Sequence, residues 1–184
     1  SSDVCSSDLP FSKFDSSLSY HKIKEGIHLI HKANPKVKTF SFQTYLKGGL
    51  TQETSTTNGS FHLISSLLNA STDSMNKLEL RHFYEERAVS YSTFSGKNAY
   101  GTTLNGIASD FREVFPTYAN SLLNSKFSTK ELNREKVITK RILKSEQKDP
   151  TRMSFKKLSH ILFSDHPYGL SQIGTIDSIS KISS

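Results

Sequence analysis

The stretch that decides the fold is GSFHLISSLL, residues 59–68. Its large apolar side chains recur at the spacing of one helical face: Phe61, Ile64, Leu67 and Leu68. His62, Ser65 and Ser66 stand at i, i+3 and i+4, so they project from one neighbouring strip of the same helix. The pattern therefore predicts a buried helix with a polar strip beside its apolar face.

The polar strip has the spacing of an inverted zinc motif, His-x-x-Glu-His. In that motif two imidazoles one helical turn apart bind the metal, and the glutamate between them activates a water molecule. This chain keeps the first histidine as His62, and it has Ser65 in place of the glutamate and Ser66 in place of the second histidine. One histidine beside two serines also fits an ordinary packed or solvated helix, so the strip alone leaves both interpretations open.

The composition fits one globular domain, or one domain and the start of another, in 184 residues. Hydrophobic residues make up 34% and aromatic residues 10%, which is enough for a core. Lys and Arg exceed Asp and Glu by 24 to 17, and this modest positive charge favours acidic partners without naming one. The single cysteine, Cys5, excludes an internal disulfide framework and a cysteine-rich zinc site. No apolar run is long enough for a membrane span, and the compartment stays open.

The first residues differ in character from the rest of the chain. Residues 1–9 repeat the tripeptide Ser-Ser-Asp around Val4 and Cys5, and they carry no periodic apolar face. We interpret residues 1–10 as a non-native or disordered leader and leave them out of the fold prediction. The domain itself is expected over residues 11–184, truncated at its C-terminal end.

Two pairs of alternating or apolar stretches predict antiparallel hairpins in one sheet. The first hairpin joins a strand at residues 27–29 to a strand at 37–46, with Asn34 and Pro35 as the turn. The second joins residues 89–95 to 98–107 through a glycine turn. We expect the strands near Thr39 and Asn98 to lie in the same sheet.

Further helices follow from capping signals and apolar spacing. Asp110 and Ser128 each precede a glutamate by three residues, which is the pattern of a capping box. Asp149 and Pro150 open another helix, since proline is tolerated in the first turn. The predicted helices span residues 75–87, 110–124 and 128–147, with one more from Pro150. Together with the hairpins they predict an α/β (α+β) fold, a two-layer sandwich of helices on an antiparallel sheet.

Short motifs flank the central helix on both sides, and their order along the chain is informative. They are Asn34-Pro35, Gly48-Gly49-Leu50-Thr51-Gln52-Glu53, Asp149-Pro150 and His166-Pro167-Tyr168-Gly169. From Gly26 onward this succession resembles the M16 metallopeptidases, the family of pitrilysin, insulinase and the mitochondrial processing peptidase. The resemblance implies an M16 half-domain, in agreement with the predicted two-layer sandwich.

The resemblance also implies where further zinc-site residues would lie. In the family a third zinc ligand, a glutamate, follows the first histidine by roughly eighty residues, and another glutamate precedes that ligand by about seven. When Val137 and Ile138 are aligned with the apolar pair between those glutamates, Arg134 and Arg141 occupy the two positions. Only His62 then remains, so the resemblance implies a non-catalytic copy with no zinc of its own.

The resemblance further implies partners. M16 peptidases are built from tandem or paired copies, of which one carries zinc, and the copies close over an unfolded peptide. The expected partners are therefore a zinc-carrying catalytic M16 repeat or subunit and an unfolded peptide substrate. An alternative is a structural M16 relative without proteolysis, like the core subunits of the respiratory cytochrome bc1 complex.

A third alternative, from a different class, is a basic binding domain. Residues 130–157 contain ten Lys and Arg against four Asp and Glu, a local charge of +6. Such a face could bind nucleic acid, but no interleaved aromatic residues or nucleic-acid motif accompany it. We expect a solvated face, or one that meets an acidic partner, and no specific nucleic-acid binding.

Overall fold

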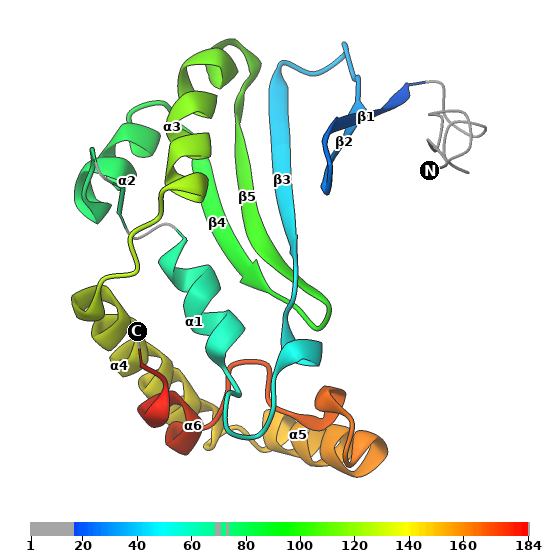
Figure 1. Ribbon diagram of the computed structural model, residues 1–184, viewed down its shortest axis with the longest axis vertical. Coiled ribbons are helices and arrows are strands. Elements are labelled where there is room, and N and C mark those ends of the chain that lie inside the picture. The colour runs from blue at the N-terminus through cyan, green and yellow to red at the C-terminus, as the bar shows by residue number, and fades with distance from the viewer. Residues whose placement is uncertain (1–16, 69–70, 73, 184) are drawn as a thin grey trace. The chain divides into compact units, whose positions relative to one another are not determined.

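The computed structural model describes residues 17–68, 71–72 and 74–183. The described part of the chain divides between Lys38 and Thr39 into two compact units (Figure 1). The predicted leader, residues 1–10, lies outside the described residues.

The first unit is an antiparallel hairpin of β1 (Leu18–Lys24) and β2 (Ile27–Lys32). Gly26, with a φ of 76°, supplies the left-handed conformation that a tight turn requires. The predicted hairpin between residues 27–29 and 37–46 is therefore wrong, because β2 pairs with β1. A turn only two residues long, which contains Gly26, brings β1 and β2 together locally, and β1 is a strand that the sequence pattern does not predict.

The second unit contains a three-stranded antiparallel sheet in the order β3-β5-β4. Its strands are β3 (Thr39–Lys47), β4 (Ser90–Ser95) and β5 (Ala99–Ile107). The register runs unbroken from Thr39 opposite Ile107 to Lys47 opposite Ala99. The predicted hairpin of β4 and β5 is confirmed, and so is the prediction that the strands near Thr39 and Asn98 share a sheet. The two predicted hairpins do not form one sheet, since β1 and β2 make a separate one.

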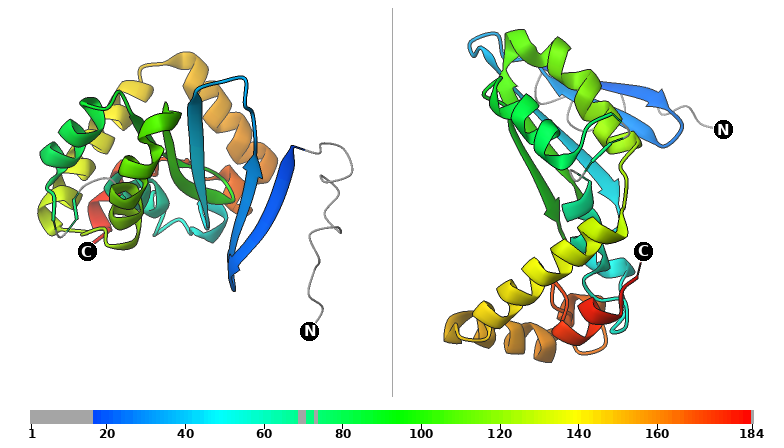
Figure 2. Two further views of the ribbon diagram at one scale, coloured as in Figure 1. Left: turned by 90° about the horizontal axis from the view of Figure 1, so that it is seen from above. Right: turned by 90° about the vertical axis from the view of Figure 1, so that its left-hand side faces the viewer.

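Helices pack on this sheet, which confirms the predicted fold class. In both figures α1, α2 and α3 lie along one face of the sheet, while α4, α5 and α6 gather at one end of it (Figure 1, Figure 2). The helices are α1 (Ser60–Leu67), α2 (Lys77–Glu85), α3 (Phe111–Leu123), α4 (Thr129–Glu146), α5 (Pro150–Phe163) and α6 (Ile176–Lys181). Short 3-10 turns are η2 (Leu50–Gln52), η3 (Ala108–Asp110) and η4 (Pro167–Gly169).

The helix starts follow the predicted caps in two cases and differ in two. Ser128 accepts from the backbone N–H of Glu131 at the start of α4, and Asp149 accepts from two N–H groups of α5. Asp110 makes no capping bond, because its carboxylate accepts from the hydroxyl of Ser109 instead. At α2 the cap is Asn76, in a complete capping box, so this helix begins two residues later than predicted.

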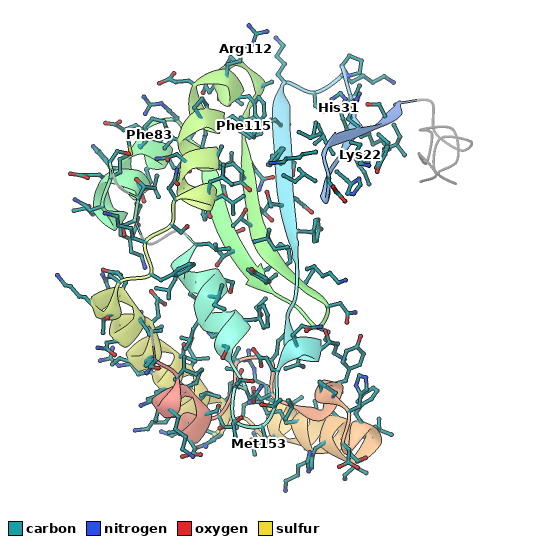
Figure 3. All side chains as sticks on the ribbon, viewed as in Figure 1. Lys22, His31, Phe83, Arg112, Phe115 and Met153 are labelled. Carbon is teal, nitrogen blue, oxygen red and sulfur yellow. The ribbon has the colours of Figure 1, made fainter. Side chains whose placement is uncertain are left out.

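The apolar interior of the second unit forms two clusters. One joins α1, α4 and α6 through Leu63, Leu67, Leu132, Leu143 and Ile179. The other joins the sheet to α2 and α3 through Leu80, Tyr84, Val89, Leu104, Val114 and Tyr118. Phe115 of α3, labelled in Figure 3, extends the second cluster. Its ring packs edge-on against the ring of Phe42, with the two ring centroids 5.3 Å apart. Each large side chain buried in this way stabilises the fold by about 1.5–3 kcal/mol.

The central helix is confirmed, and so is the expected burial of Leu63 and Leu67 on it. Leu63 and Leu67 are 1% and 3% exposed, whereas Ile64 and Phe61 are half-buried. In α2 the buried residues are Leu80 and Tyr84, whereas Leu78 is 76% exposed.

Candidate functional site

The N-terminus of α1 is held by a buried carboxylate, and this fixes the helix that carries His62. Gly59, at the N-cap with a φ of 93°, has no side chain to satisfy the first N–H groups of the helix. The carboxylate of Glu53 accepts from the N–H of Gly59 and of Phe61, both at 2.8 Å. It also accepts from Asn58 Nδ2 at 2.9 Å. A negative charge at this helix end is electrostatically favourable, so Glu53 is the functional cap of α1.

The imidazole of His62 points from α1 toward α4. Its Nε2 lies 3.3 Å from Thr139 Oγ1, within hydrogen-bond distance. The hydroxyls of Ser65 and Ser66 donate to the backbone carbonyl of His62, at 2.9 and 3.0 Å. Both serines therefore bond back onto their own helix, and the group in contact with the imidazole comes from α4.

The face of α4 that meets α1 is set by Leu132, Glu135, Thr139 and Leu143, which are all buried. Arg134 and Arg141, the positions predicted from the resemblance, are exposed on other sides of the helix. Val137 and Ile138, the apolar pair on which this assignment of positions rests, are 50% and 39% exposed. In the structure the α4 side chain within hydrogen-bond distance of the His62 ring is Thr139, and Arg141 is exposed.

Carboxylates surround His62 at longer range without bonding to it. Burial lowers the pKa of His62 below the ordinary value of an imidazole, while the carboxylates of Glu135, Glu53 and Glu146 act in the opposite direction. Glu135 forms an ion pair with Lys77, whose Nζ donates to the Glu135 carboxylate at 2.9 Å. The burial effect dominates, so the neutral imidazole is the favoured form in the fold.

The groups around His62 match poorly with a catalytic zinc. Such a site uses three nitrogen, sulfur or carboxylate ligands and keeps one position for water. The hydroxyl of Thr139 lies within hydrogen-bond distance of the His62 ring, and the hydroxyls of Ser65 and Ser66 are bonded to the backbone carbonyl of His62. Across residues 17–68, 71–72 and 74–183, no group of three or more His, Cys, Asp and Glu is placed to hold a metal ion.

The His166-Pro167-Tyr168-Gly169 segment forms η4 and attaches the C-terminal end of α5 to the sheet. Tyr168 donates from its hydroxyl to Asn98 Oδ1 at 2.9 Å, in the β4–β5 turn. The ammonium of Lys97 lies 4.5 Å from the centre of the Tyr168 ring, a cation–π distance. Gln172 donates to the carbonyl of Ser95 in the same region. The motif therefore has a structural role, because it connects the β4–β5 turn to the segment that follows α5.

Comparison with known proteins places this geometry in a family. Residues 29–176 match the family profile described as Insulinase (Peptidase family M16). The match covers most of the chain, which therefore belongs to the M16 family. Within the described residues no helix is both long and apolar enough to cross a membrane.

Similar proteins agree with this assignment. An uncharacterized zinc protease of Mycobacterium leprae (strain TN) is 22% identical over 157 residues, which are 85% of this chain and 35% of that protein. The M16 peptidase inactive domain from Pseudomonas fluorescens shares the fold with a TM-score of 0.82 at 17% identity, over 90% of this chain and 40% of that chain. A protease from Helicobacter pylori has a TM-score of 0.84 at 14% identity, with the same coverage. This chain thus spans well under half the length of these relatives.

Proposed function

We propose that this chain is a non-catalytic half or subunit of an M16-type metallopeptidase, and that it binds no zinc itself. The observation that carries the proposal is the pairing of His62 with Thr139 across α1 and α4. In the fold of a zinc peptidase family, hydroxyls here replace the side chains that hold and activate a zinc-bound water. A hydroxyl lacks the pKa of a general base near neutral pH, so Ser65 cannot replace the glutamate of the motif.

The lengths of the relatives support a second M16 copy as the partner. This chain covers 40% of the solved Pseudomonas fluorescens and Helicobacter pylori chains and 35% of the Mycobacterium leprae protein. The remainder of each is long enough for another domain of this size. Zinc and proteolysis then belong to the catalytic partner, and this chain forms part of the chamber wall.

The exposed face of the β3-β5-β4 sheet is the surface we assign to the unfolded peptide. Ser41, Gln43 and Tyr45 are exposed on β3, and Ser92 is exposed on β4. Gln43 and Ser92 stand in one row across Thr103 of β5, which gives a line of hydroxyl and amide groups. Such groups can bond to the backbone of an extended peptide whatever its sequence.

An aromatic pair adds apolar contact to this polar face. Tyr45 of β3 and Phe94 of β4 flank Gly101 of β5, with ring centroids 5.3 Å apart. Tyr45 is 65% exposed, so its ring is accessible to an apolar peptide side chain. The sheet face thus offers polar groups that can bond to a peptide backbone and one aromatic site that can contact an apolar side chain of the peptide.

The test measures peptide binding and cleavage on the same sample. A fluorescein-labelled unstructured peptide is titrated with the purified chain, with added zinc, and anisotropy and chromatography are followed. We expect binding without cleavage, and about fivefold weaker binding for Tyr45→Ala, as for loss of about 1 kcal/mol at an interface. Leu78→Ala, at a 76% exposed site on α2, is the control and should bind as the wild type does.

The outcomes separate the proposal from its alternatives. Zinc-dependent cleavage would overturn the non-catalytic assignment. Absence of peptide binding, with a stable complex between this chain and another M16 domain, would favour a purely structural role instead. Equal loss of binding in Tyr45→Ala and Leu78→Ala would show that the sheet face is not the peptide surface.

A further inference from the structure

Helix α5 carries large apolar side chains that the described part of the chain does not cover. Phe155, Leu158, Ile161 and Leu162 are 67%, 49%, 74% and 67% exposed, and together they are called the α5 stripe. None of the fourteen residues of α5 is buried. A helix of this length is marginal in water by itself, and most helical stability comes from packing of an apolar face. We therefore expect another apolar surface to pack against the α5 stripe.

The side chains of the stripe share one side of the helix. Phe155, Leu158 and Leu162 stand at i, i+3 and i+7, so they form a continuous row, and Ile161 lies one turn-spacing from Leu158. This is the pattern by which an amphipathic helix contacts another apolar surface. The stripe is thus a coherent contact surface rather than a set of scattered exposed residues.

The other sides of α5 are held by polar and aromatic contacts, which keep the stripe in a fixed position. Lys156 and Arg152 both donate to the carboxylate of Glu146 at the end of α4, at 2.6 and 3.0 Å. At the C-terminal end, the ring of Phe163 packs edge-on against Tyr168 of η4 at 5.6 Å. Because α5 is anchored at both ends, its stripe can be offered to a partner without refolding.

The charges around the stripe indicate the chemistry of the partner. Lys157 precedes Ile161 by one helical turn, and no ion pair to it is found among the described residues. Glu146, at the end of α4, is already bonded to Arg152 and Lys156, so its carboxylate does not pair with Lys157. An apolar stripe next to an uncompensated cation fits a surface with an apolar centre and carboxylates at its rim.

Two other occupants fit less well. A second copy of this chain would bring the same cationic side against itself, which like-charge repulsion disfavours. A membrane surface requires cations along the polar flank of the helix. On α5, however, Arg152 and Lys156 are already ion-paired with Glu146, which leaves Lys157 as the cation available to lipid headgroups.

We propose that the α5 stripe is the docking surface for a protein domain that presents apolar side chains rimmed by carboxylates. This rests on the proposed function, under which that domain is the companion M16 copy. The companion then contacts this chain on α5, away from the sheet face assigned to the peptide. The contact consists of the stripe at its centre and an ion pair to Lys157 at its edge.

The experiment uses a probe with the predicted chemistry and the full chain. A helical peptide with leucines at i, i+3, i+4 and i+7, flanked by glutamates, is titrated into isotopically labelled chain, and amide shifts are mapped by NMR. A matched peptide with lysine flanks is titrated in parallel. We expect shifts on α5 with the glutamate peptide, and at least tenfold weaker binding of the lysine peptide at low salt.

Variants at exposed sites keep the fold intact and localise the contact. Leu162→Ala should weaken binding of the glutamate peptide about tenfold, whereas Leu123→Ala, at a 79% exposed position on α3, should leave it unchanged. Lys157→Glu should reverse the preference between the two peptides. Lys130→Glu, at the start of α4, is its charge-matched control and should preserve the preference.

Each contrary result overturns the proposal in a different way. Absence of shifts on α5 removes the docking surface, and equal binding of both peptides removes the acidic rim. Dimerisation that is lost in Leu162→Ala, seen by sedimentation, assigns the stripe to a second copy instead. Binding to vesicles of phosphatidylcholine and phosphatidylglycerol at a ratio of about 3:1, also lost in that variant, assigns it to a membrane surface. Peptide binding on the sheet face, measured separately, is unaffected by any of these results and tests the proposed function alone.

Discussion

Glu53→Gln tests the local structure that holds His62 in place. In the wild type the buried carboxylate accepts three hydrogen bonds, from Asn58, Gly59 and Phe61. Glutamine has nearly the same shape but no charge, and its NH2 group cannot accept from an N–H. One of the two side-chain oxygens is therefore lost, together with the charge at the helix N-terminus.

The expected cost follows from these bonds. Hydrogen bonds to a charged group contribute about 1.5–3 kcal/mol, against about 0.5–1.5 kcal/mol for neutral ones, and a buried N–H left unpaired costs about 1–3 kcal/mol. Since Glu53 is only 4% exposed, little water can replace the lost acceptor. We expect Glu53→Gln to lower the free energy of unfolding by roughly 2–4 kcal/mol.

Urea denaturation at neutral pH, followed by circular dichroism, measures this change. Glu25→Gln, in the exposed turn of the β1–β2 hairpin, removes the same charge without a helix to cap and should change the unfolding free energy by less than about 0.5 kcal/mol. If Glu53→Gln is as stable as Glu25→Gln, the assignment of Glu53 as the cap of α1 is refuted.

Three further predictions concern the core, the basic face and pH. Leu67→Asp should unfold the second unit, because it removes about 1.5–3 kcal/mol of apolar burial and adds an unpaired buried charge; a cooperative unfolding transition like that of the wild type would contradict this. Nucleic-acid binding through residues 130–157 should be weak and should vanish near about 0.15 M salt in titrations at two ionic strengths; sub-micromolar, sequence-selective binding there would revive the basic binding domain. The pKa of His62 is lower in the folded state than in the unfolded state, where it is about 6.5. Between these two pKa values the unfolded state binds more protons than the folded state, so the free energy of unfolding should fall as the pH drops below about 6.5. His62→Gln should lose less stability over the same pH range, and parallel curves for the two proteins would reject the burial of His62.

The parts of the fold that were predictable depend on local pattern. The α1 helix follows from apolar spacing within residues 59–68, and the β4–β5 hairpin follows from two alternating stretches with a glycine turn between them. Strand β1 was missed because neither face of residues 18–24 is consistently apolar. Leu18, Tyr20 and Lys22 alternate with Ser19, His21 and Ile23, so there is no period-two contrast to detect.

The candidate site was predictable on α1 and not on α4. His62, Ser65 and Ser66 are fixed by local helical spacing, but their partner Thr139 is 77 residues away from His62 and depends on the rotation of α4. The buried positions Leu132 and Leu143 define that rotation, and neither stands out from the apolar residues around it. The role of Glu53 is likewise a tertiary contact, which a polar loop sequence does not indicate.

The most direct test of the central claim is the zinc content of the purified chain, measured by mass spectrometry after incubation with equimolar zinc and gel filtration. Ser66→His combined with Thr139→Glu serves as the positive control, since it places an imidazole one turn from His62 and a carboxylate where Thr139 now contacts it. The account predicts far less than one zinc per wild-type chain and about one per chain of the double variant. One tightly held zinc in the wild type, lost in His62→Ala, would contradict it.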